Sequence, residues 1–220
     1  MLEMNVDSAR HNMVECQIRT WEVLDRRILD LVARAPRHEF VPAAYRKLAF
    51  ADMQLPLAHG QAMMAPKVEA RLLQALDIRA NDKILEIGTG SGYVTWLLAQ
   101  LGRSVDSIEI FADLSATAKQ KLAAHNVTNA LLEVGDAAAG WERRQPYDVI
   151  FVTGSLPILP ESFKTSLAPG GRLAIIVGQS PAMEAKLIQR MDTHGFTETA
   201  LFETDLPALV NAKQPERFVF

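Results

Sequence analysis

The segment ILEIGTGSGYVTWLLA, residues 84–99, decides the fold. An apolar run at 83–87, typical of a buried strand, leads into the loop GTGSG at 88–92 and then into a stretch that we expect to be helical. Glycine permits positive φ angles and lets a ligand approach the backbone closely, and the free N–H groups at a helix start favour an anionic group. Ligands of open α/β sheets bind at the carboxyl ends of the strands. The segment therefore predicts a strand, a ligand-binding loop and a helix.

The rest of the chain after residue 83 repeats this alternation. Strands are expected at 83–87, 104–110, 130–134, 147–153 and 172–178, and helices at 92–102, 112–126, 160–171 and 181–195. The last of these helices is expected to end at Gly195, and two strands, 196–204 and 216–220, are expected to follow it. Alternating strands and helices predict a doubly wound, Rossmann-like parallel sheet, and two late strands without a helix between them predict an antiparallel edge.

Residues 1–80 have a different pattern, of helices and loops. Helices are expected at 7–21, 25–36 and 65–78, whereas 37–57 is interrupted by prolines and has poor periodicity. We therefore expect an N-terminal helical extension over 1–80, packed on an α/β domain over 81–220 as one compact unit.

Composition excludes several classes of function. The net charge of −3 and the lack of a basic run give no reason to expect nucleic acid or an anionic membrane as partner. No apolar run approaches the roughly 20 residues that span a bilayer, and the start of the chain does not resemble a signal peptide, so a cytoplasmic protein is expected. The single cysteine, Cys16, excludes an intramolecular disulfide and is expected in the core. The five histidines lack the spacing of metal ligands, so no metal is expected.

The glycine spacing separates two kinds of ligand. A dinucleotide loop has the pattern G-x-G-x-x-G, whereas this loop is G-x-G-x-G and is preceded by Glu86, two residues before Gly88. A carboxylate at that position would be badly placed beside a pyrophosphate, but it suits a ligand with an amino group and a sulfonium. A tight turn without any ligand is the simpler alternative.

Two further acids follow the next two predicted strands. Glu109 ends the second strand, where an acid can accept hydrogen bonds from both hydroxyls of a ribose. Asp136 follows the third strand, where it could accept a hydrogen bond from an adenine amino group. Each acid alone could be a solvated charge, but three acids at three successive strand ends favour a ligand site.

This set of residues resembles the class I S-adenosylmethionine-dependent methyltransferases. The resemblance implies a seven-stranded sheet whose last strand is antiparallel. It also implies a cofactor site in which Glu86 lies near the methionine amino group, Glu109 holds the ribose, and Asp136 and Ala137 border the adenine. The cofactor loop itself would consist of Gly88, Thr89, Gly90 and Gly92.

Further segments resemble the protein-L-isoaspartate O-methyltransferase family. They are MVECQI (13–18), RHEFVP (37–42), AFADMQLPLAHGQ (49–61), ILEIGTGSGY (84–93), PYDVIFVT (146–153) and LAPGGRLAIIVG (167–178). In that family the segment before the first strand carries G-x-G-Q-T-I-S and forms the pocket for the isoaspartyl residue. Here residues 58–64 read AHGQAMM, so Ala62 and Met64 stand where the family has hydroxyls, and Met64 cannot donate a hydrogen bond.

The resemblance implies methyl transfer from S-adenosylmethionine to isoaspartyl carboxylates of damaged proteins and peptides. Such a carboxylate is ionised at neutral pH, so no general base is required and catalysis consists mainly of positioning in a dry pocket. His59, Gln61 and backbone N–H groups could orient the carboxylate in place of the missing hydroxyls. Two alternatives stay open, namely a small-molecule methyltransferase on the same scaffold and a cofactor-binding protein without catalysis.

Overall fold

The fold is built on a seven-stranded sheet with the strand order β5-β4-β3-β6-β7-β8-β9. The computed structural model describes residues 5–191 and 195–216. The strands are β3 (Lys83–Ile87), β4 (Ser104–Glu109), β5 (Ala130–Val134), β6 (Tyr147–Leu156), β7 (Leu167–Gln179), β8 (Ala182–Arg190) and β9 (Phe196–Thr204). The first five are parallel, whereas β8 is antiparallel to both of its neighbours. The prediction of a doubly wound, seven-stranded α/β sheet with an antiparallel edge is confirmed.

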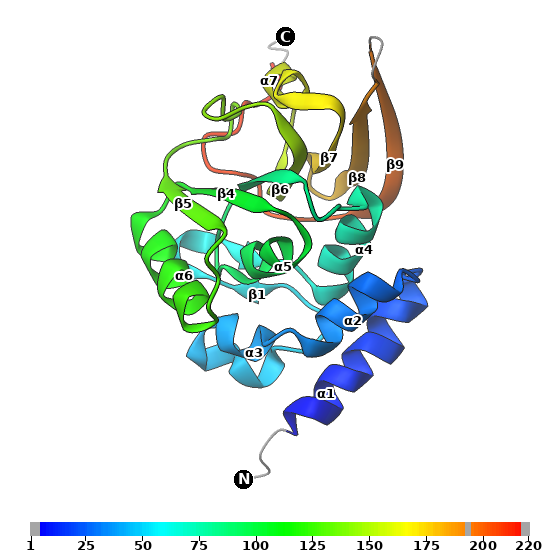
Figure 1. Ribbon diagram of the computed structural model, residues 1–220, viewed down its shortest axis with the longest axis vertical. Coiled ribbons are helices and arrows are strands. Elements are labelled where there is room, and N and C mark those ends of the chain that lie inside the picture. Colours follow the sequence, from blue (N-terminus) through cyan, green and yellow to red (C-terminus); the bar gives the residue numbers. More distant parts are fainter. Residues whose placement is uncertain (1–4, 192–194, 217–220) are drawn as a thin grey trace.

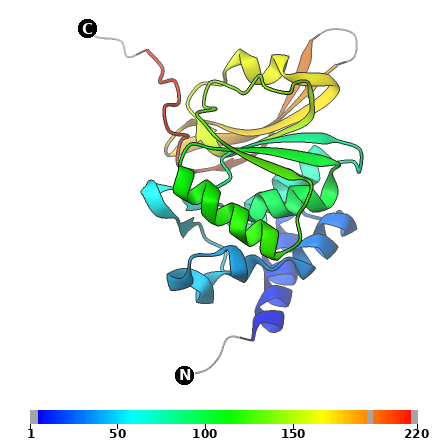
Figure 2. The ribbon, with the colours of Figure 1, turned by 60° about the vertical axis from the view of Figure 1, so that its left-hand side comes forward.

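Helices cover both faces of this sheet (Figures 1 and 2). α5 (Tyr93–Leu101) and α6 (Ala112–Ala124) lie on one face, and α7 (Glu161–Thr165) lies on the other. The chain runs from β3 outward to β4 and β5 and then returns to β6, so the strand order reverses between β3 and β6. The carboxyl ends of strands at such a switch point are where open α/β sheets bind ligands.

The N-terminal elements lie on the same side of the sheet as α5 and α6 (Figure 2), and the last of them, the helix at 66–76, contacts β7 and β8 directly. They are α1 (Val6–Asn12), a π-helical segment (Met13–Ile18), a 3-10 turn (Arg19–Trp21), α2 (Arg26–Arg34), α3 (Arg37–Phe40), a 3-10 segment (Ala43–Leu48) and α4 (Pro66–Leu76). A small two-stranded sheet, β1 (Leu55–Pro56) and β2 (Ala62–Met63), encloses a 3-10 turn at Ala58–Gly60. The three predicted N-terminal helical stretches are thus present, and Asp25 caps α2 by accepting a hydrogen bond from the Arg27 N–H.

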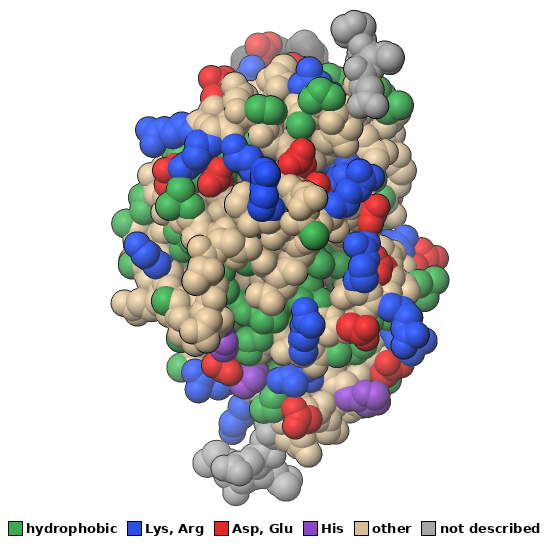
Figure 3. All heavy atoms as spheres, in the orientation of Figure 1, with side chains coloured by type: hydrophobic (Ala, Val, Ile, Leu, Met, Phe, Trp, Pro, Cys, Tyr) green, Lys and Arg blue, Asp and Glu red, His purple; other side chains and the backbone are tan. Residues whose placement is uncertain are grey.

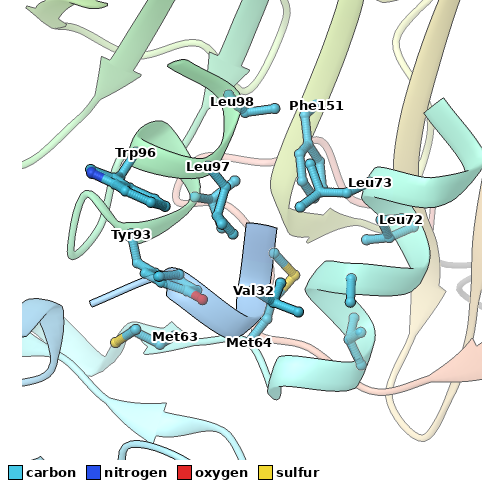
Figure 4. Close-up of a cluster of buried hydrophobic side chains, with 14 of the residues drawn as sticks. Val32, Met63, Met64, Leu72, Leu73, Tyr93, Trp96, Leu97, Leu98 and Phe151 are labelled. Carbon is cyan, nitrogen blue, oxygen red and sulfur yellow. The ribbon is translucent and has the colours of Figure 1, made fainter. Parts of the chain in front are cut away.

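One buried cluster joins the N-terminal part to the sheet (Figure 4). It contains Val32 of α2, Leu72 and Leu73 of α4, Leu97 of α5 and Phe151 of β6, all of them buried. Because these side chains come from both parts of the chain, burial of the N-terminal helices stabilises the domain that carries the glycine loop.

The predicted helix at 181–195 is wrong. Residues 182–190 form β8, which returns from β7 through a tight turn and pairs with both β7 and β9. The apolar residues Met183, Leu187, Ile188 and Met191 of the predicted helix have the i, i+4, i+5, i+8 spacing of a helix face. In the sheet, Met183 and Ala185 are buried on one face and Ile188 is buried on the other. Gly195 lies in the β8–β9 connection and ends no helix, and the strand predicted at 216–220 falls almost wholly outside the described residues.

Two other expectations need correction. Cys16 is exposed and is not a core residue, because the π-helical segment turns its side chain outward while Met13, Val14 and Ile18 are buried. The helix predicted at 160–171 ends at Thr165, since β7 already begins at Leu167.

The surface shows no concentration of one kind of charge on the face seen in Figure 3, where basic and acidic side chains are interspersed. Within residues 5–191 and 195–216, no helix has both the length and the apolar character required to cross a membrane. The same residues contain no cluster of three or more histidine, cysteine, aspartate or glutamate side chains that could hold a metal ion.

The turn from β7 into β8 depends on Gly178, which predicts a specific loss of stability. Gly178 has a φ of 131°, and a Cβ there would lie 2.6 Å from the Ala182 carbonyl oxygen of the opposing strand. We expect Gly178→Ala to lower the free energy of unfolding by about 2–3 kcal/mol in urea denaturation. Gly195→Ala is the control, because Gly195 also has a positive φ, of 103°, but its Cβ would meet no atom of the described residues within 4 Å. Equal losses in the two variants would contradict the steric explanation.

Candidate functional site

The carboxyl ends of β3, β4, β5 and β6 border a cavity that opens to solvent. Five chain segments line it, and they lie within residues 57–64, 87–94, 108–114, 135–138 and 153–154; residues 206–210 and Glu69 complete the wall. The cavity therefore lies at the switch point of the sheet, where the glycine loop was expected to bind its ligand.

The glycine loop has the conformation that its sequence predicts. Gly88 has a φ of 92°, and a Cβ there would collide with the Thr153 hydroxyl, which itself donates a hydrogen bond to the Ile87 carbonyl at 2.9 Å. Gly92 has a φ of 84° and packs against Ala118 of α6, where a Cβ would lie 3.0 Å from the Ala118 Cβ. Glycine is thus required both for the turn and for close packing of the loop on its neighbours.

Glu109 connects the end of β4 to this loop. One of its carboxylate oxygens, Oε2, accepts the Gly90 N–H at 2.8 Å, and Oε1 accepts the Phe111 N–H at 3.1 Å. Glu109 lines the cavity and is buried. Each carboxylate oxygen has two lone pairs, so both can still accept a hydrogen bond from a ligand hydroxyl.

Glu86 lies beneath the loop and is not part of the cavity wall. Its Oε2 accepts hydrogen bonds from Thr95 at 2.6 Å and Ser107 at 2.5 Å, and Ser107 in turn bonds to the Thr89 hydroxyl at 2.6 Å. The other oxygen, Oε1, is buried without a partner among the described residues. Burial raises the pKa of Glu86 to about 8, and the nearby charge of Glu109 adds to that effect.

Asp136 and Ala137 follow β5 and line the cavity, as expected. The Asp136 carboxylate accepts the Ala138 N–H at 3.0 Å and the Asn211 side-chain N–H at 2.9 Å. Through Asn211 the segment 206–212 is joined to the site, and Leu206, Pro207, Leu209 and Val210 form part of the wall. Sequence reasoning missed this wall, since an irregular segment after the last strand has no periodic signal.

The loop at 58–64 forms the opposite wall. Gln61, Ala62, Met63 and Met64 all line the cavity, and the two methionines are buried beside Tyr93 (Figure 4). The Gln61 amide donates a hydrogen bond to the His59 carbonyl at 3.2 Å. The structure thus brings Gln61 and Met64 to the same cavity as the glycine loop.

His59 lies outside this wall. Its ring stacks on Phe111 with centroids 4.1 Å apart, and its Nε2 lies 2.9 Å from the Asp113 carboxylate. These contacts, which we call the His59 clasp, hold the tip of the 58–64 loop against the start of α6. They position the loop, and they turn the imidazole away from the cavity lining.

Arg37 fixes the other end of the same loop from below. Its guanidinium is completely buried and donates to the Ala49 carbonyl at 2.8 Å and the Met64 carbonyl at 2.7 Å. A third hydrogen bond goes to the Glu69 carboxylate, and the guanidinium lies over the Tyr93 ring at 4.6 Å. Arg37 belongs to the RHEFVP segment, but neither it nor Glu69 was identified as a site residue from the sequence.

Comparison with known proteins identifies the family. The family model of protein-L-isoaspartate(D-aspartate) O-methyltransferase matches residues 8–211. The chain belongs to this family. It is 40% identical over 182 residues to a protein-L-isoaspartate O-methyltransferase from Methanoculleus marisnigri, with 82% of this chain and 83% of that protein covered. It is 38% identical over 186 residues to protein-L-isoaspartate O-methyltransferase 1 from Syntrophobacter fumaroxidans, with 84% and 87% covered.

Solved structures of the same family share the fold. A protein-L-isoaspartate O-methyltransferase superposes with a TM-score of 0.76 at 24% identity, over 90% of this chain and 65% of the other. A Plasmodium falciparum chain solved in complex with S-adenosyl-L-homocysteine superposes with a TM-score of 0.78 at 19% identity, over 94% and 99% of the two chains.

All the charged side chains that line the cavity, among the described residues, are acids. In the part of the chain that the structure describes, Glu69, Glu109 and Asp136 line it, and no lysine, arginine or histidine does. A carboxylate-lined cavity favours a ligand with positive charge and hydrogen-bond donors. A sulfonium nucleoside with an amino group, ribose hydroxyls and an adenine amino group has these properties.

The buried Glu86 predicts a pH dependence of stability. Because its pKa rises from 4.5 to about 8 on folding, the folded state holds a proton that the unfolded state releases. The stability that this group contributes is complete below pH 4.5 and is lost as the pH rises through about 8. In urea denaturation at a series of pH values, Glu86→Gln should therefore lose less stability than the wild type between pH 5 and pH 8.5.

Burial also raises the pKa of Glu69, which makes stability fall with rising pH in both the wild type and Glu86→Gln. The difference between their two slopes of stability against pH is therefore due to Glu86. Glu203→Gln is the control, because Glu203 is exposed and should leave the slope unchanged. If the free energy of unfolding of Glu86→Gln fell with pH as steeply as that of the wild type, Glu86 would not be protonated in the folded protein.

Proposed function

We propose that this chain transfers the methyl group of S-adenosylmethionine to the carboxylate of L-isoaspartyl residues in damaged proteins and peptides. One observation carries the proposal: a glycine loop and two acids, Glu109 and Asp136, line a cavity at the switch point of the sheet. The chain that holds this cavity belongs to the family. The segments of residues 13–178 that resemble the family occur in the family's order and spacing, which supports the proposal further.

The cofactor would be held by residues of the strand ends. Glu109 would accept hydrogen bonds from the ribose hydroxyls, and Asp136 with Ala137 would border the adenine. Backbone groups of the glycine loop, from Gly88 and Thr89 to Gly90 and Gly92, would contact the methionine portion. Glu86, with its unpaired buried oxygen below this loop, would stabilise the amino group from beneath. When bound, the cofactor supplies an electrophilic methyl group on a positively charged sulfur.

The chain itself has to position the nucleophile and exclude water. The isoaspartyl carboxylate is ionised at neutral pH, so an oxygen lone pair attacks the methyl carbon as the carbon–sulfur bond breaks and its electron pair stays on sulfur. No proton is transferred in this step, so the residues of the wall need not include a base. Met63, Met64, Leu206 and Leu209 would keep the pocket dry, and Gln61 would orient the carboxylate.

A second function is favoured by the composition of the wall. Ala62 and Met64 present only apolar groups to the cavity, which suits a small apolar substrate better than a peptide carboxylate. The same scaffold would then methylate a small molecule. A chain that binds the cofactor without catalysis is the third possibility.

Cofactor binding can be tested directly by calorimetric titration with S-adenosylhomocysteine. We expect saturable binding to the wild type, and a loss of affinity of about tenfold to a hundredfold in Glu109→Ala, because hydrogen bonds to a charged group contribute roughly 1.5–3 kcal/mol. Glu203→Ala, an exposed acid outside the cavity, should bind as the wild type does. Absence of binding to the wild type would refute the cofactor assignment.

Restoring the two hydroxyls tests the substrate. Ala62→Thr combined with Met64→Ser should raise kcat/KM for an isoaspartyl peptide by roughly tenfold or more, because each hydroxyl can donate to the carboxylate. Ala58→Ser is the matched control, since it adds a hydroxyl to the same loop at an exposed position outside the cavity lining. Thermal unfolding verifies that each variant is folded.

The other outcomes separate the three functions. Unchanged isoaspartyl methylation, together with strong labelling of a small apolar acceptor, would favour the small-molecule enzyme. Cofactor binding without single-turnover methyl transfer to any acceptor would favour the binding protein.

A further inference from the structure

Glu69 is a cavity-lining acid that the proposed reaction does not use. It lies in the first turn of α4, five residues after Met64, and its carboxylate is buried. Of the three acids in the described lining, Glu109 and Asp136 belong to the strand ends that would hold the cofactor. Glu69 instead belongs to the helix that follows the 58–64 loop, so it stands on the substrate side of the cavity.

The two oxygens of Glu69 have different surroundings. Oε2 accepts the hydrogen bond from Arg37, whereas Oε1 has no partner among the described residues and is not fully enclosed by protein atoms. Arg37 is also bonded to the carbonyls of Ala49 and Met64 and lies over the Tyr93 ring. A proton on Oε1 would therefore leave every hydrogen bond of Arg37 in place.

A substrate carboxylate in this cavity would meet a second carboxyl group in a site of low dielectric constant. Two carboxyl groups that share such a site do not both ionise, and they hold one proton between them. On the substrate side of the cavity the 58–64 loop offers no hydroxyl donor, because Met64 and Ala62 cannot donate from their side chains. The hydroxyls of Thr89, Ser91 and Thr153 belong to the glycine loop and to β6, on the cofactor side. One protonated carboxyl group would remove the repulsion and supply the missing donor.

We propose that Glu69 is a specificity-determining residue that binds the isoaspartyl carboxylate through a shared proton. This inference rests on the proposed function. The hydroxyl on Oε1 donates a hydrogen bond to one substrate oxygen, and the other substrate oxygen attacks the methyl carbon. As the new oxygen–carbon bond forms, the carbon–sulfur bond breaks and its electron pair stays on sulfur, so the proton remains on Glu69.

The electrostatic surroundings are consistent with a proton at this position. Burial raises the pKa of Glu69 to about 7, although the charge and hydrogen bond of Arg37 act in the opposite direction. The other titratable group packed against the pair is Tyr93 of α5, whose pKa burial raises further above its ordinary value, so it stays neutral. Across the cavity the acids are Glu109 and Asp136, and a negative charge at either of them favours the protonated form of Glu69. Glu86 lies beneath the glycine loop, and because burial raises its pKa to about 8 it adds no negative charge near neutral pH.

Proton uptake on substrate binding tests the proposal without requiring catalysis. An isoaspartyl peptide is titrated into the complex with S-adenosylhomocysteine at pH 8.5 in two buffers of different ionisation enthalpy. The wild type should take up close to one proton at this pH and almost none near pH 5.5. Its affinity for the peptide should fall by roughly tenfold for each pH unit above about 7.

Substitutions at Glu69 give the matched comparison. In Glu69→Gln the amide is a permanent donor of nearly the same shape, so proton uptake should disappear and peptide affinity should no longer depend on pH. Glu69→Met removes the donor and should bind the peptide weakly at every pH. Glu203→Gln, at an exposed position, should keep the wild-type proton uptake. If Glu69→Gln alone fails to fold, Arg37→Gln with Glu69→Gln keeps the amide and removes the unpaired guanidinium.

The outcomes distinguish this inference from the proposed function. Methylation of the peptide without proton uptake, or an unchanged pH dependence in Glu69→Gln, would overturn the role of Glu69 and leave the proposed function standing. Weaker binding by Glu69→Gln than by the wild type at pH 8.5 would also overturn it, because the ionised form would then be the binding form. A wild type that neither binds nor methylates the peptide at pH 5.5 would refute the proposed function, and the inference with it.

Discussion

One guanidinium group holds together the parts of the chain that form the substrate side of the site. Arg37 donates hydrogen bonds to Ala49, which follows the 3-10 segment Ala43–Leu48, to the loop at Met64 and to α4 at Glu69. Its guanidinium also lies over the aromatic ring of Tyr93 at the start of α5. A buried charge is tolerated only when its donors are satisfied, and removal of one partner of such a pair costs about 3–5 kcal/mol. These four segments must therefore be placed together, and the loop acquires its position from that requirement.

The distribution of charge around the cavity follows from the same arrangement. The nearest buried cation uses its donors on two carbonyls and one carboxylate below the wall, and does not line the cavity. The lining keeps three acids, with the glycine loop tied to Glu109 through the Gly90 N–H. A positively charged sulfonium would be stabilised in such a cavity, and a negatively charged acceptor would need help to enter it.

The sequence predicted the parts of the structure that repeat or are local. The strand, loop and helix at 84–99 could be predicted because the glycines of the loop have a fixed spacing. The acids could be predicted because each lies close to the end of a predicted strand. The helix predicted at 181–195 was wrong because apolar residues of that segment, Met183, Leu187 and Ile188, also have the spacing of a helix face, and pairing with β7 and β9 decides for the strand. Arg37 and Glu69 were missed because they are 32 residues apart and a buried pair leaves no pattern along the chain. His59 was named as a residue that could orient the substrate carboxylate, whereas its partners in the structure are Phe111, beside the start of α6, and Asp113, on α6.

The hydrogen bond from Arg37 to the loop goes to the carbonyl of Met64 and not to its side chain. Backbone pairing of Leu55 with Met63 and of Pro56 with Ala62 likewise does not depend on which side chains are present. The backbone course of the loop is thus set by contacts that do not involve the side chains at positions 62 and 64, although Met64 is buried and its replacement by a smaller residue would still cost packing energy. Because the backbone contacts that position the loop are separate from the side chains that face the acceptor, the acceptor that the pocket prefers can be changed while the cofactor site on the strand ends is retained.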